Sequence, residues 1–314
     1  MKQLLLTTLY FVSVITFNCF SQKQHDLEGR WDLTLENFNG KQAPSWLEVR
    51  HSGYETLVGR FVFAFGSARP VSEIKTFDNK FTFTIPRQWE PVGSDMVIHG
   101  ELKDNKLKGT LLYTDGSIIN WTGVKAPTLP YTADPKWEKT IALFNGKDLN
   151  GWHADQDENQ WIVTDGILTS PKSGANLISD EKFTDFMLEA EFRYPKNGNS
   201  GIYLRGRYEV QVADNHGLEP SDIYFGGVYG FVEPNENAAK PAGEWQRYEI
   251  TLIGNRVTVI ANGKTVIHNQ TIPGITGGAL DSNEGEAGPI MIQGDHQPVE
   301  FRKFNITPIK NPTK

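Results

Sequence analysis

The chain has 314 residues, a formal net charge of −7 and one cysteine. The acidic balance argues against nucleic-acid binding, and a lone cysteine excludes zinc–thiolate sites, iron–sulfur clusters and disulfide frameworks within the chain. The length suggests two domains, and no basic amphipathic segment indicates membrane binding.

Residues 1–21 have the character of a signal peptide. Lys2 precedes an apolar run over residues 4–17, and small residues at Cys19 and Ser21 favour cleavage before Gln22. We therefore expect a periplasmic or secreted protein whose mature chain has no cysteine. The alternative is a lipoprotein acylated on Cys19, although Phe17 and Asn18 are poor neighbours for that signal.

Strand patterns dominate the remaining chain. Period-two runs of aromatic and β-branched residues occur as FVFAF (61–65), FTFTI (81–85) and VTVI (257–260). Turn pairs punctuate them at residues 78–79, 104–105, 115–116, 165–166 and 262–263. No long segment has a helical period, so the sequence predicts an all-β protein.

Residues 125–136 contain three prolines and predict a linker between two independently folded units. Residues 22–127 have about eight short strand patterns, which favour a small antiparallel β-barrel. Trp31, Leu33 and Leu35 share one face of the first strand, and Gly29-Arg30-Trp31 weakly resembles the opening of lipocalin-like and avidin-like barrels. We expect Trp31 to be structural, and the barrel to be an accessory or sugar-docking module.

Four features of the C-terminal part have both a structural and a functional interpretation. Trp152, Trp161 and Trp245 adjoin apolar strand residues, so we expect core positions rather than sugar stacking. An acidic run holding Asp155, Asp157 and Glu158 is compatible with a calcium loop, although such runs are more often solvated turns.

The segment GNSGIYLRGRYEVQV (198–212) is the most informative stretch. Interpreted as extended chain, it places apolar residues on one face and a polar row on the other. A ring, two cations, a carboxylate and an amide in one row suit a sugar-binding sheet, although an ordinary solvated face is the alternative. That row consists of Tyr203, Arg205, Arg207, Glu209 and Gln211.

Several further motifs follow one another in order: LFNGKDLNGW (143–152), WIVTDGIL (161–168), GVYG (227–230), PAGEW (241–245), VIANG (259–263) and IQGDH (292–296). Together with residues 198–212, they resemble the 3-keto-disaccharide hydrolase domain family. The resemblance implies a concanavalin A-like jelly-roll sandwich over residues 137–314, with a concave sugar-binding face. It also implies cleavage of 3-keto-glycosides and an oligosaccharide or glycoside as the partner.

Site residues follow from the resemblance and from local chemistry. Laminarinase-type enzymes of this fold carry two further acids after the residue that Glu209 resembles, but Gln211 and Ala213 stand at the comparable positions. Direct acetal hydrolysis by paired carboxylates is therefore in doubt. A 3-keto group offers another route, because it acidifies the C2 hydrogen. Removal of that hydrogen needs only one good base.

We expect Glu209 as that base, Arg205 or Arg207 as the stabiliser of the enolate, and His296, oriented by Asp295, as the acid or water activator. Glu209 and His296 could exchange roles, and a divalent cation could replace arginine. The expected substrate-binding residues are Asn199, Ser200, Tyr203, Arg207, Gln211, Tyr229 and Gln293. The alternatives are a non-catalytic lectin-like protein and a surface scaffold that displays the barrel.

Overall fold

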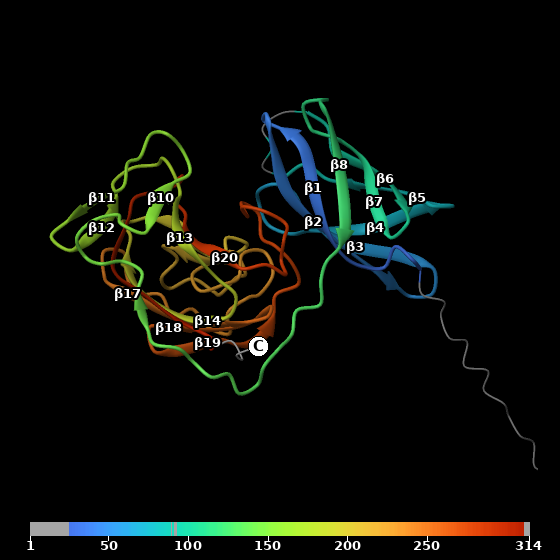
Figure 1. Cartoon of the computed structure of the whole chain (residues 1–314). Helices are drawn as coiled ribbons and strands as arrows, with labels where there is room; N and C mark the ends of the chain where they lie inside the picture. The colour runs from blue at the N-terminus through green and yellow to red at the C-terminus, as the bar shows by residue number, and fades with distance from the viewer. Residues whose placement is uncertain (1–24, 89, 91–92, 311–314) are drawn as a thin grey trace, which may run out of the picture.

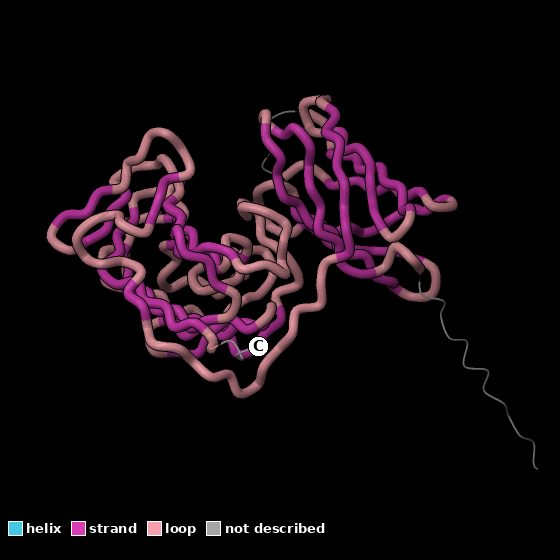
Figure 2. Tube along the Cα trace, viewed as in Figure 1, coloured by secondary structure: helices cyan, strands magenta, loops and turns pink. Residues whose placement is uncertain are grey.

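The computed structural model describes residues 25–88, 90 and 93–310. The predicted signal peptide, residues 1–21, lies outside this range. The described chain consists of strands and loops only (Figure 2), so the prediction of an all-β protein is confirmed. Within the described residues, no helix has the length and apolar character needed to cross a lipid bilayer.

Eight antiparallel strands close the N-terminal barrel, because β1 pairs with both β2 and β8. The strands are β1 (Gly29–Phe38), β2 (Lys41–Ser52), β3 (Thr56–Val62), β4 (Arg69–Phe77), β5 (Lys80–Ile85), β6 (Met96–Lys103), β7 (Lys106–Leu112) and β8 (Ile118–Lys125). Trp31, Leu33 and Leu35 point into the barrel core, as their shared face predicts. The Trp31 indole donates to the Leu27 carbonyl at 2.8 Å, which fits its expected structural role.

A two-sheet sandwich follows, and it confirms the predicted concanavalin A-like jelly roll. One sheet has the order β10-β13-β20-β15-β16, and the other has the order β11-β12-β21-β14-β17-β18-β19 with β9 paired to β21. The first sheet contains β10 (Trp152–Ala154), β13 (Leu177–Phe183), β15 (Asn199–Leu204), β16 (Tyr208–Ala213) and β20 (Gly288–Ile292). The second contains β9 (Ile141–Ala142), β11 (Ile162–Thr164), β12 (Ile167–Ser170), β14 (Phe186–Arg193), β17 (Gln246–Ile253), β18 (Arg256–Ala261), β19 (Lys264–Thr271) and β21 (Val299–Pro308).

The tryptophans divide between core and surface. Trp152 and Trp161 are buried in the sandwich core, as expected. For Trp245 the expectation of a core position is wrong. Its ring is half-buried, with the guanidinium carbons of Arg193 and Arg302 at 4.7 and 4.4 Å from its centroid. Two flanking cations stabilise an aromatic ring near the surface, so the Trp245 ring is stable without complete burial among apolar residues.

The barrel and the sandwich share a core at the contact visible between them in Figure 1. Trp46 and Val62, on β2 and β3, are fully buried among the apolar residues of the sandwich. The Trp46 ring meets Phe231 edge-on at 5.3 Å. Gly274 leaves room for the indole, because a Cβ there would lie 2.2 Å from the Trp46 ring. The barrel therefore contributes apolar residues to the packing of its neighbour.

The predicted linker runs as extended chain from β8 around the sandwich (Figure 1). It is anchored at several points: Arg30 donates to the Pro127 carbonyl at 2.9 Å, and the Arg256 guanidinium lies 5.1 Å from the Tyr131 ring centroid. Independent folding of the two parts stays a prediction. The shared Trp46 packing is the feature that a separated sandwich would lose.

Candidate active site

The polar segment 198–212 is a hairpin rather than one continuous strand. Strands β15 and β16 pair antiparallel, with Leu204 opposite Tyr208 and Tyr203 opposite Glu209. Residues 205–207 form the turn, in which Arg205 and Gly206 have φ angles of 54° and 67°. Because the turn interrupts the period-two alternation, the predicted single polar row does not exist.

The two arginines of the turn lie away from the remaining polar residues. Arg205 donates to the Gly254 carbonyl at 2.6 Å and lies over the Tyr208 ring. Arg207 bonds the Asp281 carboxylate at 2.7 Å and is almost fully buried. Their guanidinium groups attach the hairpin to neighbouring loops, so the structure does not bring the two predicted enolate stabilisers to Glu209.

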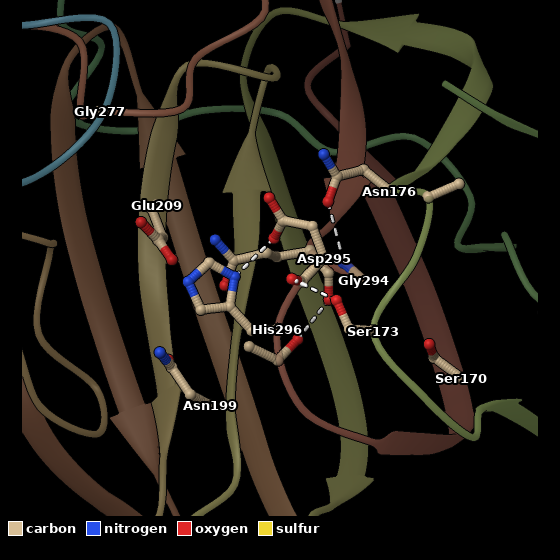
Figure 3. A network of polar contacts seen from close by, with 12 residues as sticks. Ser170, Ser173, Asn176, Asn199, Glu209, Gly277, Gly294, Asp295 and His296 are labelled. Atoms are coloured by element: carbon tan, nitrogen blue, oxygen red, sulfur yellow. Dashed lines mark hydrogen bonds and ion pairs between the residues drawn. The ribbon is translucent and has the colours of Figure 1, made fainter. Parts of the chain in front are cut away.

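Seven of the predicted site residues do come together around one cavity of about 420 Å³. They lie on β15, β16, the loop after β20 and the loop that follows β16, and part of this arrangement is shown in Figure 3. The cavity lining is Phe65, Gly66, Asn199, Tyr203, Glu209, Tyr229, Gly277, Gln293, Asp295 and His296.

Glu209 is the buried carboxyl group of this cavity. Burial raises the pKa of Glu209 to about 8; the contact with the Tyr203 hydroxyl opposes this increase, and the nearby Asp295 charge adds a smaller part to it. Its Oε2 lies 2.9 Å from the Tyr203 hydroxyl, which also lies 2.8 Å from the Gly277 carbonyl. A hydroxyl has one proton, so both contacts are satisfied when neutral Glu209 donates to Tyr203 and Tyr203 donates to Gly277. Near neutral pH, Glu209 is thus a proton donor.

A glycine on the partner strand makes space for this carboxyl. A Cβ on Gly201 would lie 2.2 Å from Glu209 Oε1. No heavy atom approaches a side-chain Cβ so closely, so a side chain at this position would displace the Glu209 carboxyl. The absence of a side chain at Gly201 therefore leaves the space that the carboxyl occupies.

Asp295 and His296 form the second polar group of the cavity. Asp295 Oδ1 lies 2.6 Å from His296 Nδ1, and Ser173 donates to the Asp295 carbonyl at 2.7 Å. The carboxylate of Asp295 raises the pKa of His296. It also selects the tautomer with a proton on Nδ1, which leaves Nε2 unprotonated in the neutral ring. Figure 3 shows this second nitrogen on the side of Glu209.

Amide side chains supply ligand-binding capacity. Gln211 donates to Asn199 Oδ1 at 2.8 Å, which leaves the Asn199 amide nitrogen directed toward His296 and Glu209 (Figure 3). The buried Oε1 atoms of Gln211 and Gln293 have no hydrogen-bond partner among the described residues. Buried acceptors normally have partners, and Gln293 lines the cavity, so its oxygen is suited to accept a hydrogen bond from a sugar hydroxyl.

Two predicted binding residues lie just behind the cavity. Ser200 is buried and donates to the Gln293 carbonyl at 2.7 Å, so it positions the loop after β20. Gln211 reaches the cavity through Asn199 and does not line it.

Asp155, in the acidic run at residues 155–158, has a structural role in the described chain. Both carboxylate oxygens of Asp155 accept from Asn176, one from its backbone and one from its side chain, each at 2.9 Å. Across residues 25–88, 90 and 93–310, no three His, Cys, Asp or Glu side chains gather in a group that could hold a metal ion.

Sequence reasoning missed three lining residues: Phe65 and Gly66 of the barrel and Gly277 of the sandwich. Nothing local in FVFAF (61–65) distinguishes Phe65 from a core residue. The contact between Gly66 and Gly277 joins segments more than 200 residues apart in the sequence. Only the Gly-Gly pair at 277–278 indicates a close approach of two backbones.

Residues 139–307 match the 3-keto-alpha-glucoside-1,2-lyase-like domain. A 3-keto-disaccharide hydrolase of Bacteroides thetaiotaomicron is 28% identical over 169 residues, which are 41% of this chain and 55% of the relative. The chain thus spans about half the length of this curated relative.

Among solved structures, a candidate glycosyl hydrolase from Parabacteroides distasonis is 31% identical with a TM-score of 0.46, over 56% of this chain and 92% of that chain. A second from the same organism is 24% identical with a TM-score of 0.44, over 54% of this chain and 98% of that chain.

Proposed function

Because the chain belongs to the 3-keto-alpha-glucoside-1,2-lyase-like domain family through residues 139–307, we propose that it is a carbohydrate-active enzyme that cleaves 3-keto-glycosides. One observation carries the proposal: the cavity contains a buried Glu209 that favours its neutral form, opposite an Asp295–His296 pair. A neutral acid and an oriented imidazole are the two partners that an elimination requires.

The proposed reaction proceeds in two stages. A base removes the proton from C2, and the electron pair forms an enolate with the C3 ketone. The enolate then expels the C1 oxygen, which takes a proton as the aglycone leaves and gives an unsaturated 3-keto sugar. In the second stage, water adds its hydroxyl to C1 and a proton returns to C2. The net change is hydrolysis, and no oxidant or reductant is consumed.

The cavity supports a different division of labour from the one first expected. Neutral Glu209 cannot accept a proton, so we assign it as the acid for the departing oxygen and His296 Nε2 as the base for C2. The sequence left this exchange of roles open. In place of the arginines, the Asn199 amide and the Tyr229 hydroxyl line the cavity and are the candidate donors for the enolate oxygen.

Direct acetal hydrolysis has less support. A glycosidase that uses paired carboxyl groups needs both of them available to the substrate. The second carboxyl group of the cavity, Asp295, is already engaged with His296 at 2.6 Å, and Gln211 replaces an acid on β16. The single available carboxyl, Glu209, suits the elimination better.

The test compares a 3-keto-glucoside with its unoxidised parent in heavy water. We expect rapid cleavage of the keto substrate, slow cleavage of the parent, and deuterium at C2 of the 3-keto product. His296→Ala should lower turnover by roughly 10²- to 10⁴-fold, the usual contribution of a general base. His153→Ala is the matched control, because His153 forms a similar pair with Asp180 at 2.7 Å outside the cavity.

Two results would contradict the proposal. Equal cleavage of the parent glycoside, or a product without deuterium at C2, would exclude the elimination. Binding of both glycosides without cleavage of either would identify the lectin-like alternative.

The proposal includes export, for which residues 1–21 are the support. A mature protein beginning at Gln22 in an intact-mass measurement is the expected result, and a lipid on Cys19 would contradict it.

A further inference from the structure

The barrel supplies one wall of the candidate active site. Phe65 and Gly66, in the loop between β3 and β4, line the same cavity as Glu209 and His296. A barrel that served only to dock elsewhere on a polymer would not need to reach this cavity. Its loop is therefore a component of the site.

The loop is held against the sandwich by backbone contacts. The Gly278 amide donates to the Ala64 carbonyl at 2.9 Å. A Cβ on Gly277 would lie 2.2 Å from the Gly66 carbonyl oxygen, so the two backbones touch without intervening side chains. The Tyr203 hydroxyl in turn contacts the Gly277 carbonyl at 2.8 Å. Phe65 is consequently fixed relative to the Glu209–Tyr203 pair.

Phe65 is the cavity-side member of an aromatic cluster at this end of the barrel, which we call the aromatic shelf: Phe38, Phe63, Phe65 and Tyr113. Phe65 lies 5.7 Å from Phe38 and 5.4 Å from Phe63 between ring centroids. Tyr113 stacks on Phe63 at 5.3 Å. Phe63 is buried, whereas the other three rings are half-buried. Of these four rings, Phe65 is the one that lines the cavity, and it packs against the buried Phe63.

The two sides of the cavity differ in chemistry. The sandwich side presents amide, carboxyl, imidazole and phenol groups, which are the groups that bind sugar hydroxyls. On the barrel side, the Phe65 ring has no hydrogen-bonding atom, and Gly66 has no side chain. A planar apolar group placed against Phe65 leaves no polar group of its own unpaired. A sugar ring can also stack on Phe65, but neither Phe65 nor Gly66 has a side-chain group that binds its hydroxyls.

We propose that the barrel is the aglycone-binding wall of the site and that Phe65 is a specificity-determining residue for planar, apolar aglycones. This inference rests on the proposed function for the orientation of the substrate, with the keto sugar on the sandwich side and the leaving group toward the barrel. The substrate class it names is aryl glycosides, in preference to disaccharides.

The test compares binding affinities and needs no turnover. Titration calorimetry would measure the affinity of the full protein for phenyl glucoside, methyl glucoside and a glucosyl disaccharide, each in its unoxidised form. Phe65→Ala should lower the affinity for phenyl glucoside roughly three- to tenfold, the range for losing one aromatic contact. The same variant should change the affinity for methyl glucoside by less than about twofold. Phe77→Ala is the matched control, because Phe77 is a barrel phenylalanine that is 78% exposed and does not line the cavity.

Phe65→Leu keeps apolar volume without a ring face and gives a second variant if alanine perturbs folding; it should also weaken phenyl glucoside selectively. The inference is overturned if phenyl and methyl glucosides lose affinity equally, if the disaccharide loses as much as phenyl glucoside, or if Phe77→Ala has the same effect as Phe65→Ala.

The same proteins separate this inference from the proposed function. If Phe65→Ala selectively loses phenyl glucoside binding and no variant cleaves 3-keto substrates, the aglycone wall is supported and the proposed enzyme activity is refuted. If Phe65→Ala cleaves 3-keto-glycosides and its preference for phenyl over methyl glucoside is unchanged, the enzyme activity is supported and the aglycone wall is refuted.

Discussion

The protonation of Glu209 predicts a specific pH dependence of catalysis. With a pKa of about 8, this carboxyl would be about nine-tenths protonated at pH 7 and about one-tenth protonated at pH 9. If Glu209 donates the proton to the leaving group, kcat/KM should fall about tenfold between these two values. At lower pH, kcat/KM should rise as His296 loses its proton, with the midpoint above the ordinary histidine value because Asp295 raises the pKa of His296. The expected profile is a bell.

The assay is the initial rate of aglycone release from a 3-keto-glucoside between pH 5 and 10, corrected for the base-catalysed reaction without enzyme. Glu209→Gln should lower the rate roughly 10²- to 10⁴-fold and abolish the fall above pH 8, because an amide does not titrate. Carbon-13 labelling of the glutamate carboxyl groups would follow the proton directly. A rate that continues to rise through pH 8–9 would refute this reasoning and make Glu209 the base.

Two further predictions concern the contact between barrel and sandwich. Trp46→Ala should lower the free energy of unfolding by roughly 3–5 kcal/mol, because it empties the space that Gly274 leaves for the indole. Chemical denaturation measures this free energy, and a loss below about 1 kcal/mol would show that the contact between barrel and sandwich is weak. Asp32, buried beside Glu284, has a pKa raised from 3.8 to about 8, by burial first and by the Glu284 charge second. A carboxyl whose pKa is higher in the folded state stabilises the fold below its unfolded pKa, so stability should decline as pH rises from about 4 to about 8. Asp32→Asn should flatten that decline in thermal melts, and an unchanged slope would exclude Asp32 as its source.

The local pattern of the chain was sufficient for much of the fold. The alternation in FTFTI (81–85) is strand β5, and Asn262-Gly263 is a hairpin turn in which both residues have positive φ angles. Period and turn chemistry act over a few residues, so they can be interpreted without knowledge of the remaining chain.

The candidate site was only partly accessible to such reasoning. Asp295 and His296 are adjacent in sequence, and their pairing could be anticipated. The turn at residues 205–207 could not, because two successive positive φ angles, at Arg205 and Gly206, redirect both arginines. Phe65 reaches the cavity through packing between distant segments, and no period or motif encodes such a contact.

The position of β21 within its sheet has a consequence for how the protein folds. This strand is the last of the sandwich in chain order, yet it lies between β12 and β14 in the interior of the sheet. During synthesis, the barrel can close as soon as β8 is available, whereas β14 has an unpaired edge until residues 299–308 emerge. Contacts of such long sequence separation form slowly. If the barrel folds independently, as we expect, Trp46 on its outer face would give the late sandwich a preformed apolar surface on which to assemble.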